Sequence, residues 1–175
     1  KWVQDLKSGF KAGPFIICNP LTGKPAPTKS GGQSYRGDNN VSAFRYGIAE
    51  FDNLSIEDQI RFWTAVRLPI TALVHTGGKS IHAWIRIEGI VDLESWNREI
   101  KVRLYERLLI PLGLDRACSN PARLSRLPGF VRKESGAMQR LLYFGAEIDA
   151  RIRTAVERGK SGQDSPGAFA AGGLN

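Results

Sequence analysis

The stretch VHTGGKSIHAWIRIEG, residues 74–89, decides the fold because a glycine-rich turn is followed by a regular alternation. From Ile81 onward apolar and polar side chains alternate, which is typical of a half-buried strand. A nucleotide-triphosphatase P-loop would need glycine at position 73 and a helix directly after Ser80. Position 73 is Leu73. The stretch therefore predicts strand, turn, strand, and it excludes a P-loop.

The Gly77-Gly78 turn has two interpretations. A Gly-Gly pair between two apolar runs is an ordinary hairpin signal, so the segment can be a turn with no further role. In the other interpretation it holds phosphate, because Lys79 and His82 would lie side by side at the mouth of the hairpin. An ammonium and an imidazole there could both reach a polyanion.

Two helices are predicted from apolar residues spaced three and four apart. Residues 54–69 start at the N-cap Ser55, and residues 91–114 start at the N-cap Asp92. The expected buried stripes are Ile56, Ile60, Trp63 and Val66 in the first helix and Leu93, Trp96, Ile100, Leu104 and Leu108 in the second. A third, shorter helix is expected from Glu147 to Arg158.

Strands are expected before and between these helices. Strand patterns occur at Phe15–Cys18 and at residues 41–53. After the second helix, two extended segments flank a turn at residues 133–136. Residues 23–40 are rich in Pro, Gly, Ser and Lys and predict a long mobile loop. This order of elements predicts an α+β fold around an antiparallel or mixed sheet, not a doubly wound parallel one.

Composition fits one globular domain with an acidic partner. The chain has 175 residues, 42% of them hydrophobic, and a net charge of +8, which favours partners such as nucleic acid. No apolar run approaches the roughly 20 residues needed to cross a membrane, and we expect a cytoplasmic protein with no membrane contact. Cys18 and Cys118 are far apart, which favours buried thiols in a reducing compartment over a zinc site or a disulfide.

The two ends of the chain differ from its middle. The chain begins with Lys1, and we expect it to be part of a longer polypeptide. Residues 160–175 are mainly Gly, Ala and Ser, with little to bury, and we expect a flexible C-terminal tail or linker. Residues 1–159 would then form a single domain.

Carboxylates at a predicted strand end suggest a metal site. Glu50 and Asp52 stand two residues apart, so their side chains leave the same face and can share a divalent cation. The alternative is that both are solvated where the strand enters a loop. A third carboxylate could come from Asp115 or from Asp92, although Asp92 already has a role as a helix cap. Arginines downstream that could neutralise phosphate are Arg123, Arg126 and Arg132.

Together these segments resemble the archaeo-eukaryotic primase superfamily, in the form found in primase-polymerases of phages, plasmids and prophages. The resemblance rests on Glu50 and Asp52 in AEFD, on Thr76 to His82 in HTGGKSIH, and on Asp115 in LD, followed by NPARLSRLPGFVR. It covers the chain from about Phe15 to Phe144. Glu50 departs from the family pattern, since many members have Asp at that position.

The resemblance implies a divalent-metal nucleotidyltransferase, a DNA primase, a DNA polymerase or both. Glu50, Asp52 and Asp115 would hold Mg²⁺ or Mn²⁺, and His82 would join them as a catalytic residue. The implied contacts to the incoming nucleotide are Thr76, Gly77, Gly78, Lys79, Ser80, His82 and Arg126, with Arg36 as a nucleotide or template contact. The implied partners are a single-stranded DNA template and primer, NTPs or dNTPs, and a helicase domain in the same longer chain. The implied fold is an RRM-like sheet with an added N-terminal α/β unit.

Two other functions stay open on the residues alone. A non-catalytic replication module would bind nucleic acid through its basic surface, with salt-sensitive affinity that does not depend on Glu50 or Asp52. A metal-dependent nuclease would use the same carboxylates but would have no use for a triphosphate-binding hairpin.

Overall fold

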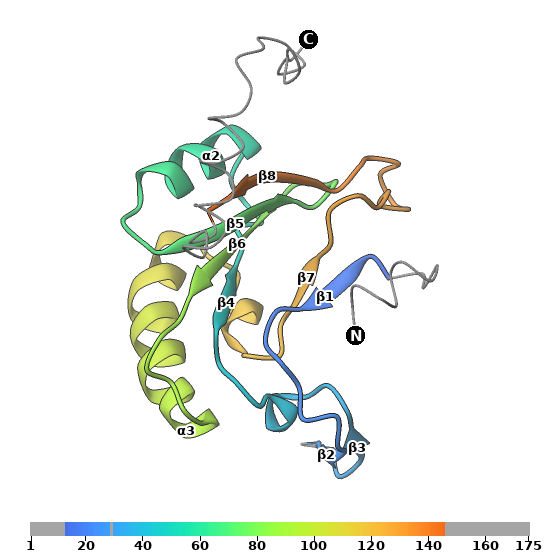
Figure 1. Cartoon of the computed structure of the whole chain (residues 1–175). Coiled ribbons are helices and arrows are strands. Elements are labelled where there is room, and N and C mark those ends of the chain that lie inside the picture. The colour runs from blue at the N-terminus through green and yellow to red at the C-terminus, as the bar shows by residue number, and fades with distance from the viewer. Residues whose placement is uncertain (1–12, 29, 146–175) are drawn as a thin grey trace, which may run out of the picture. The chain divides into compact units, whose positions relative to one another are not determined.

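A four-stranded antiparallel sheet with strand order β4-β6-β5-β8 organises residues 13–28 and 30–145, which are the residues that the computed structural model describes (Figure 1). Its strands are β4 (Tyr46–Ala49), β5 (Ile70–His75), β6 (Ile81–Arg86) and β8 (Arg140–Phe144). Helix α2 (Ile56–Ala65) joins β4 to β5, and β6 lies between these two strands, which is a split β-α-β arrangement. The predicted α+β class is confirmed.

The glycine-rich segment forms the hairpin that the alternation predicts. β5 and β6 pair antiparallel with His75 opposite Ile81, and the Thr76 N–H donates to the Ser80 carbonyl at 3.1 Å. A strand follows Ser80 and not a helix, so the P-loop stays excluded. Ile81, Ala83 and Ile85 are each at most 1% exposed, so the odd-numbered positions of β6 face the core as expected.

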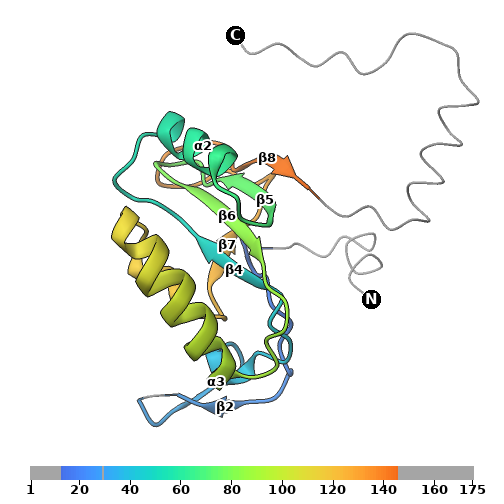
Figure 2. The same cartoon turned by 90° about the vertical axis from the view of Figure 1, so that its left-hand side faces the viewer.

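Two helical segments cover this apolar face of the sheet (Figure 2). α2 contributes Trp63, and the long helix contributes Trp96, Tyr105 and Leu109 to the same core cluster as Ile81. The long helix consists of α3 (Leu93–Ser95), which continues as η2 (Trp96–Leu109) and then as the 3-10 turn η3 (Ile110–Leu112). The core therefore lies between the helices and the odd-numbered face of β6.

The opposite face of the sheet meets a second, two-stranded unit. β1 (Phe15–Ile17) pairs antiparallel with β7 (Leu124–Arg126), and Ser125 of β7 accepts a hydrogen bond from the Trp84 indole at 2.8 Å. Trp84 belongs to the even-numbered positions of β6. Polar side chains of the sheet and of the β1-β7 pair consequently face each other.

The segment before β4 contains more structure than the expected mobile loop. β2 (Ala26–Pro27) pairs with β3 (Gln33–Ser34), and the 3-10 turn η1 (Asp38–Asn40) follows. Within the described residues this N-terminal part is built from strands and a 3-10 turn, and the α-helix of the expected α/β unit is absent from residues 13–28 and 30–45.

The predicted helix stripes are wrong at two positions. Ile60 is 39% exposed, and its neighbour Gln59 is buried because it bonds to the hairpin. Leu108 is 48% exposed and Leu109 is buried, because η2 is a π-type helix whose hydrogen bonds run from residue i to i+5. The wider turn moves the buried stripe away from the spacing of an α-helix.

The remaining expectations concern a membrane span and the C-terminal residues. Among the described residues, none of the helices combines the length and the apolar character that a membrane span needs. The expected helix from Glu147 to Arg158 and the expected tail at residues 160–175 lie outside the described residues.

Candidate active site

A cavity of about 390 Å³ opens between the β5-β6 hairpin, the end of β4 and the β1-β7 pair. It brings together most of the residues that the sequence singled out, and its lining comprises Phe15, Glu50, Asp52, Thr76, Lys79, Ser80, His82, Arg123, Leu124, Arg126 and Arg132. Two carboxylates and four cationic side chains share this space. The arrangement suits a ligand that carries several negative charges together with a cation.

Glu50 is the most heavily engaged side chain of the cavity. Ser80 Oγ and His82 Nε2 each lie 3.0 Å from Oε2, and Arg123 Nη2 donates to Oε1 at 2.9 Å. Burial by itself would raise the pKa of this carboxyl, but the hydrogen bonds from His82, Arg123 and Ser80 outweigh it and hold the pKa well below its usual range. Glu50 is therefore an ionised carboxylate despite being buried.

The hydrogen bonds of His82 fix which ring nitrogen carries the hydrogen. Nδ1 accepts from the Arg126 backbone N–H at 3.2 Å, and it lies 3.1 Å from Ser125 Oγ. Nε2 must then be the donor toward Glu50. The β7 strand thus orients the imidazole, and the imidazole in turn orients the Glu50 carboxylate.

Asp115 joins Glu50 through the backbone. An isolated bridge pairs Phe51 with Leu114, and the Asp115 N–H donates to the Glu50 carbonyl at 3.0 Å. Ligand atoms of Glu50, Asp115 and Cys118 all lie within 4.8 Å of one another. Two carboxylate oxygens at this separation fit a divalent cation such as Mg²⁺ or Mn²⁺.

Arg123 is the resident counter-ion of this cluster. Its Nη2 lies 2.9 Å from Glu50 Oε1 and 3.4 Å from Asp115 Oδ2. One guanidinium therefore lies close to both carboxylates and offsets part of their negative charge. Any cation that binds there competes with Arg123.

Asp92, the other candidate for the third carboxylate, has a different role. Its side chain accepts from the Ser95 N–H at 2.7 Å and caps α3, as the sequence predicts. Neither aspartate lines the cavity itself, but only Asp115 belongs to the group of ligand atoms around Glu50. Asp115 is therefore the candidate that the fold brings to Glu50.

Asp52 lines the same cavity but stands apart from the Glu50 cluster. Its side chain is 44% exposed, and its carboxylate lies 3.6 Å from the Lys79 ammonium. Glu50 is drawn inward by Arg123 and His82, so the two carboxylates are held by different cations although they leave the strand end in the same direction. The sequence spacing did not show this difference.

The remaining cations line the cavity from the β7 side. The Arg126 guanidinium lies over the Phe15 ring at 4.2 Å from its centroid, a cation–π contact. Arg132 lies against Gly78 and pairs with Glu134 at 3.2 Å. Among the described residues Arg126 makes no ion pair, so its charge is available to a ligand.

Gln59 holds the hairpin turn in place, a role that the sequence did not reveal. The side chain is fully buried, its amide nitrogen donates to the Lys79 carbonyl at 2.9 Å, and its amide oxygen accepts from the Ile81 N–H at 2.8 Å. A polar residue on an otherwise apolar helix stripe was the available signal. Gln59 thereby aims Lys79 into the cavity from the rigid end of α2.

Three predicted nucleotide contacts use their polar atoms within the protein. Thr76 Oγ1 donates to the Ser80 carbonyl at 2.9 Å, while Ser80 and His82 both bond Glu50. All three residues are at most 6% exposed. In the structure these side chains shape the turn and orient Glu50. The resemblance had implied that they contact the triphosphate instead. His75, outside the cavity lining, accepts from the Gly77 N–H at 3.2 Å and so stabilises the turn.

Arg36 is the predicted site residue that the fold places elsewhere. It does not line the cavity around Glu50, and instead it lines a separate pocket beside η1 and the long helix. The residue follows β3, whose hairpin with β2 lies away from the β5-β6 hairpin (Figure 1).

Comparison with known proteins supports the fold. No family model and no curated protein matches the sequence. A solved structure, the AEP domain (PP-N190) of the cyanophage S-2L primase-polymerase (PrimPol), is similar with a TM-score of 0.53 and 24% sequence identity. The match covers 70% of this chain and 65% of that chain. The chain therefore shares the archaeo-eukaryotic primase fold that the sequence motifs indicated.

Proposed function

We propose that this chain catalyses template-directed nucleotidyl transfer, as a DNA primase, a DNA polymerase or both. The observation that carries the proposal is the cavity in which Glu50 and Asp52 lie among the cations Lys79, Arg123 and Arg126, on a chain with the archaeo-eukaryotic primase fold. Asp115 adjoins it through Arg123 and Glu50. Carboxylates and cations that share one cavity suit a metal-bound nucleoside triphosphate. Its fold neighbour belongs to a cyanophage, and we assign the chain to replication of a phage or mobile element.

In this proposal each residue has a limited task. Lys79 from the hairpin and Arg126 from β7 bind the triphosphate, the lysine as a compact charge and the arginine through its planar guanidinium. Ser80 and His82 hold Glu50 ionised and oriented. The Gly77-Gly78 turn keeps the hairpin close to the segment around Arg132.

Glu50, Asp52 and Asp115 are the residues that would hold Mg²⁺ or Mn²⁺. Carboxylate oxygens suit both ions, and the thiol of Cys118 lies within the same cluster. When bound, such an ion activates the attacking 3′-hydroxyl and stabilises the pyrophosphate leaving group. The protein contributes fixed carboxylates and a cationic wall that require little rearrangement.

The test is incorporation of labelled nucleotide on a single-stranded DNA template. Primed and unprimed templates are supplied with Mg²⁺ or Mn²⁺, with NTPs or dNTPs, to the chain and to its Asp52→Ala variant. We expect metal-dependent product from the chain and a loss of at least tenfold in the variant, since Asp52 is one of the three carboxylates proposed to hold the metal. Product in the unprimed reaction would add primase activity.

Other outcomes of this assay separate the alternatives. Equal product from Asp52→Ala would contradict the assignment of this carboxylate. Degradation of the template would favour a nuclease. Salt-sensitive DNA binding without product under any condition would favour a non-catalytic replication module.

A second prediction concerns Arg123 and metal affinity. Replacing Arg123 by Gln removes the positive charge that lies 2.9 Å from Glu50 and 3.4 Å from Asp115. A dication in the same cluster is repelled by that charge, so we expect Mn²⁺ to bind about tenfold more tightly to the variant. Electron paramagnetic resonance of free Mn²⁺ measures the affinity without relying on activity.

Arg126→Gln is the matched control. It removes one arginine from the same cavity, but this arginine contacts the Phe15 ring and neither carboxylate of the cluster. We expect a change in Mn²⁺ affinity of no more than about twofold for the control. An Arg123→Gln variant that binds Mn²⁺ no better than Arg126→Gln would show that Arg123 does not compete with the metal.

A further inference from the structure

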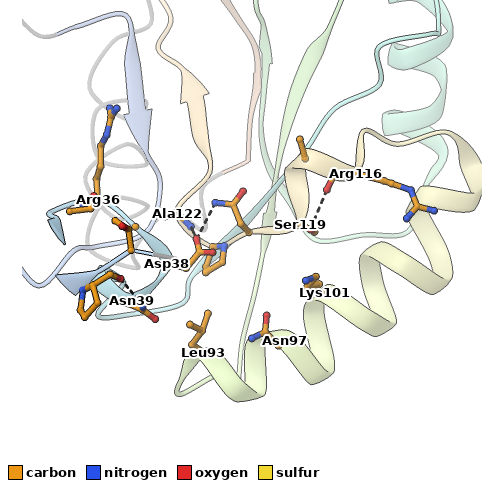
Figure 3. Close-up of a pocket in the computed structure, with 16 residues that line it drawn as sticks. Arg36, Asp38, Asn39, Leu93, Asn97, Lys101, Arg116, Ser119 and Ala122 are labelled. Carbon is orange, nitrogen blue, oxygen red and sulfur yellow. Dashed lines mark hydrogen bonds between the residues drawn. The ribbon is translucent and has the colours of Figure 1, made fainter. Parts of the chain in front are cut away.

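A second pocket, of about 630 Å³, lies beside the long helix (Figure 3). Three parts of the chain enclose it. They are the β2-β3 hairpin with η1, the start of the long helix, and the segment from η4 (Arg116–Ser119) to Ala122. None of the residues that line this pocket also lines the catalytic cavity.

Three cationic side chains line this pocket, each from a different part of the chain. Arg36 follows β3, Lys101 belongs to the long helix, and Arg116 begins η4. Figure 3 shows Arg36 and Arg116 on opposite sides, with Lys101 on the helix below them. In the part of the chain that the structure describes, none of the three forms an ion pair.

The carboxylate of this pocket, Asp38, is already committed to the protein. Its Oδ1 accepts from Asn120 Nδ2 at 3.1 Å and from the Ala122 N–H at 3.3 Å, and this fixes η1 to the segment after η4. Asp38 therefore holds the pocket together without pairing with an arginine or lysine there. The pocket retains a net positive charge that favours an anion.

The long helix contributes two polar side chains, Asn97 and Lys101, to the same space. Leu93, Asn97 and Lys101 recur at intervals of four residues and line the pocket from one face of the long helix (Figure 3). Asn97 adds an amide donor beside the lysine. Asn39 lies on the far wall, where its side chain donates to the Pro27 carbonyl at 3.2 Å. An extended ligand with several separated phosphates fits cations spread in this way better than a single small anion does.

The pocket is linked in sequence to the catalytic cavity. Residues 116, 117 and 119–122 line the pocket, and Arg123, Leu124 and Arg126 directly after them line the cavity. Cys118, within the same segment, contacts Glu50 through its thiol at 3.6 Å. A long, extended polyanion bound across this segment would run from the pocket toward the cavity.

We propose that this second pocket binds the sugar-phosphate backbone of single-stranded nucleic acid, with Arg36, Lys101 and Arg116 as phosphate contacts. The inference rests on the proposed function for the identity of the strand, which would be the template. The contacts go to phosphates, so binding through them does not depend on base sequence. This site also gives Arg36 a role at a distance from the nucleotide.

The test is the affinity for a fluorescent single-stranded oligothymidylate of about 20 nucleotides, with no metal and no nucleotide present. Each phosphate contact to a single strand contributes about 0.7 to the slope of log affinity against log salt. At about 0.1 M salt the loss of one such contact therefore weakens the affinity about fivefold. We expect the Arg36→Ala, Arg116→Ala double variant to bind about 25-fold more weakly, with a salt slope reduced by about 1.4.

The matched control is the Arg67→Ala, Arg107→Ala double variant. Both variants lose two arginines that are exposed, but Arg67 and Arg107 line neither site. We expect the control to bind within about threefold of the parent, since its charges act only at long range. Thermal melting of both variants checks that each is folded.

Two results would overturn the inference. One is equal weakening in both double variants, which would show that only the overall charge matters. The other is lost affinity for inorganic phosphate or ATP with unchanged affinity for the oligothymidylate, which would identify a small-anion site. This assay contains no metal and no nucleotide, so its result does not depend on whether the chain transfers nucleotides. Failure of the proposed phosphate contacts can therefore be distinguished from failure of the proposed nucleotidyl transfer.

Discussion

Nucleotide incorporation by a Glu50→Gln variant is expected to fall by on the order of 10³-fold, while the variant binds single-stranded DNA as well as the parent does. Glutamine keeps the shape of the side chain but only one of its two oxygens, so it can accept either from Arg123, which bonds Oε1, or from Ser80, which bonds Oε2. The negative charge is lost. That charge is what a metal ion requires here, and it is buried among groups that hold its pKa low.

Asp92→Asn is the control for this prediction. It is also a carboxylate-to-amide change, at the other residue that sequence spacing allowed as a third carboxylate, but Asp92 caps α3 outside the cavity. We expect a change in incorporation of less than about twofold, because asparagine is also a good N-cap. Comparable losses in the two variants, or a Glu50→Gln variant with more than about a tenth of parental activity, would remove Glu50 from the proposed site.

The hairpin and the class of fold could be predicted because both depend on local patterns. Alternation after Gly78 identifies a strand, and the buried positions Ile81, Ala83 and Ile85 are those that the pattern indicates. The N-cap Ser55 was also predictable, since a cap needs only the residue itself and the three that follow it.

Partners far apart in sequence could not be predicted from spacing. Glu50 and Arg123 are 73 residues apart, and their contact depends on the bridge between Phe51 and Leu114. The burial of Gln59 could not be predicted for the same reason, because its partners Lys79 and Ile81 belong to the β5-β6 hairpin and not to its own helix. A helical stripe records which face is buried, and it does not show that a polar residue on that face has a distant partner.

The candidate site was therefore predicted as a set of residues more accurately than as a set of roles. Seven of its predicted side chains line one cavity, including Glu50, Lys79 and Arg126. Yet His82, expected at the triphosphate, bonds Glu50, and Asp52, expected beside Glu50, pairs with Lys79. The neighbours that the fold supplies decide these pairings, and they become visible only when the side chains from β7 and from the hairpin are placed around the carboxylates.

A Gly77→Ala variant is expected to be destabilised by about 2–5 kcal/mol. Gly77 has a positive φ of 71°, which costs an alanine about 1–2 kcal/mol. In addition, a Cβ at this position would lie 2.8 Å from the Ala137 carbonyl oxygen, and overpacking of this kind adds about 1–3 kcal/mol. That carbonyl cannot easily retreat, since it accepts from the Arg132 N–H at 2.8 Å.

Gly89→Ala separates the two contributions. Gly89 has nearly the same φ, 73°, but a Cβ there would meet no atom within 4 Å. We expect it to lose only about 1–2 kcal/mol, so its melting temperature should exceed that of Gly77→Ala by roughly 3–10 °C. Chemical denaturation and thermal melting measure both values. Equal losses in the two variants would mean that the glycine is required only for its backbone conformation, and that the hairpin does not press against the segment around Ala137. A larger loss for Gly77→Ala would show that this contact fixes the turn whose Lys79 enters the cavity.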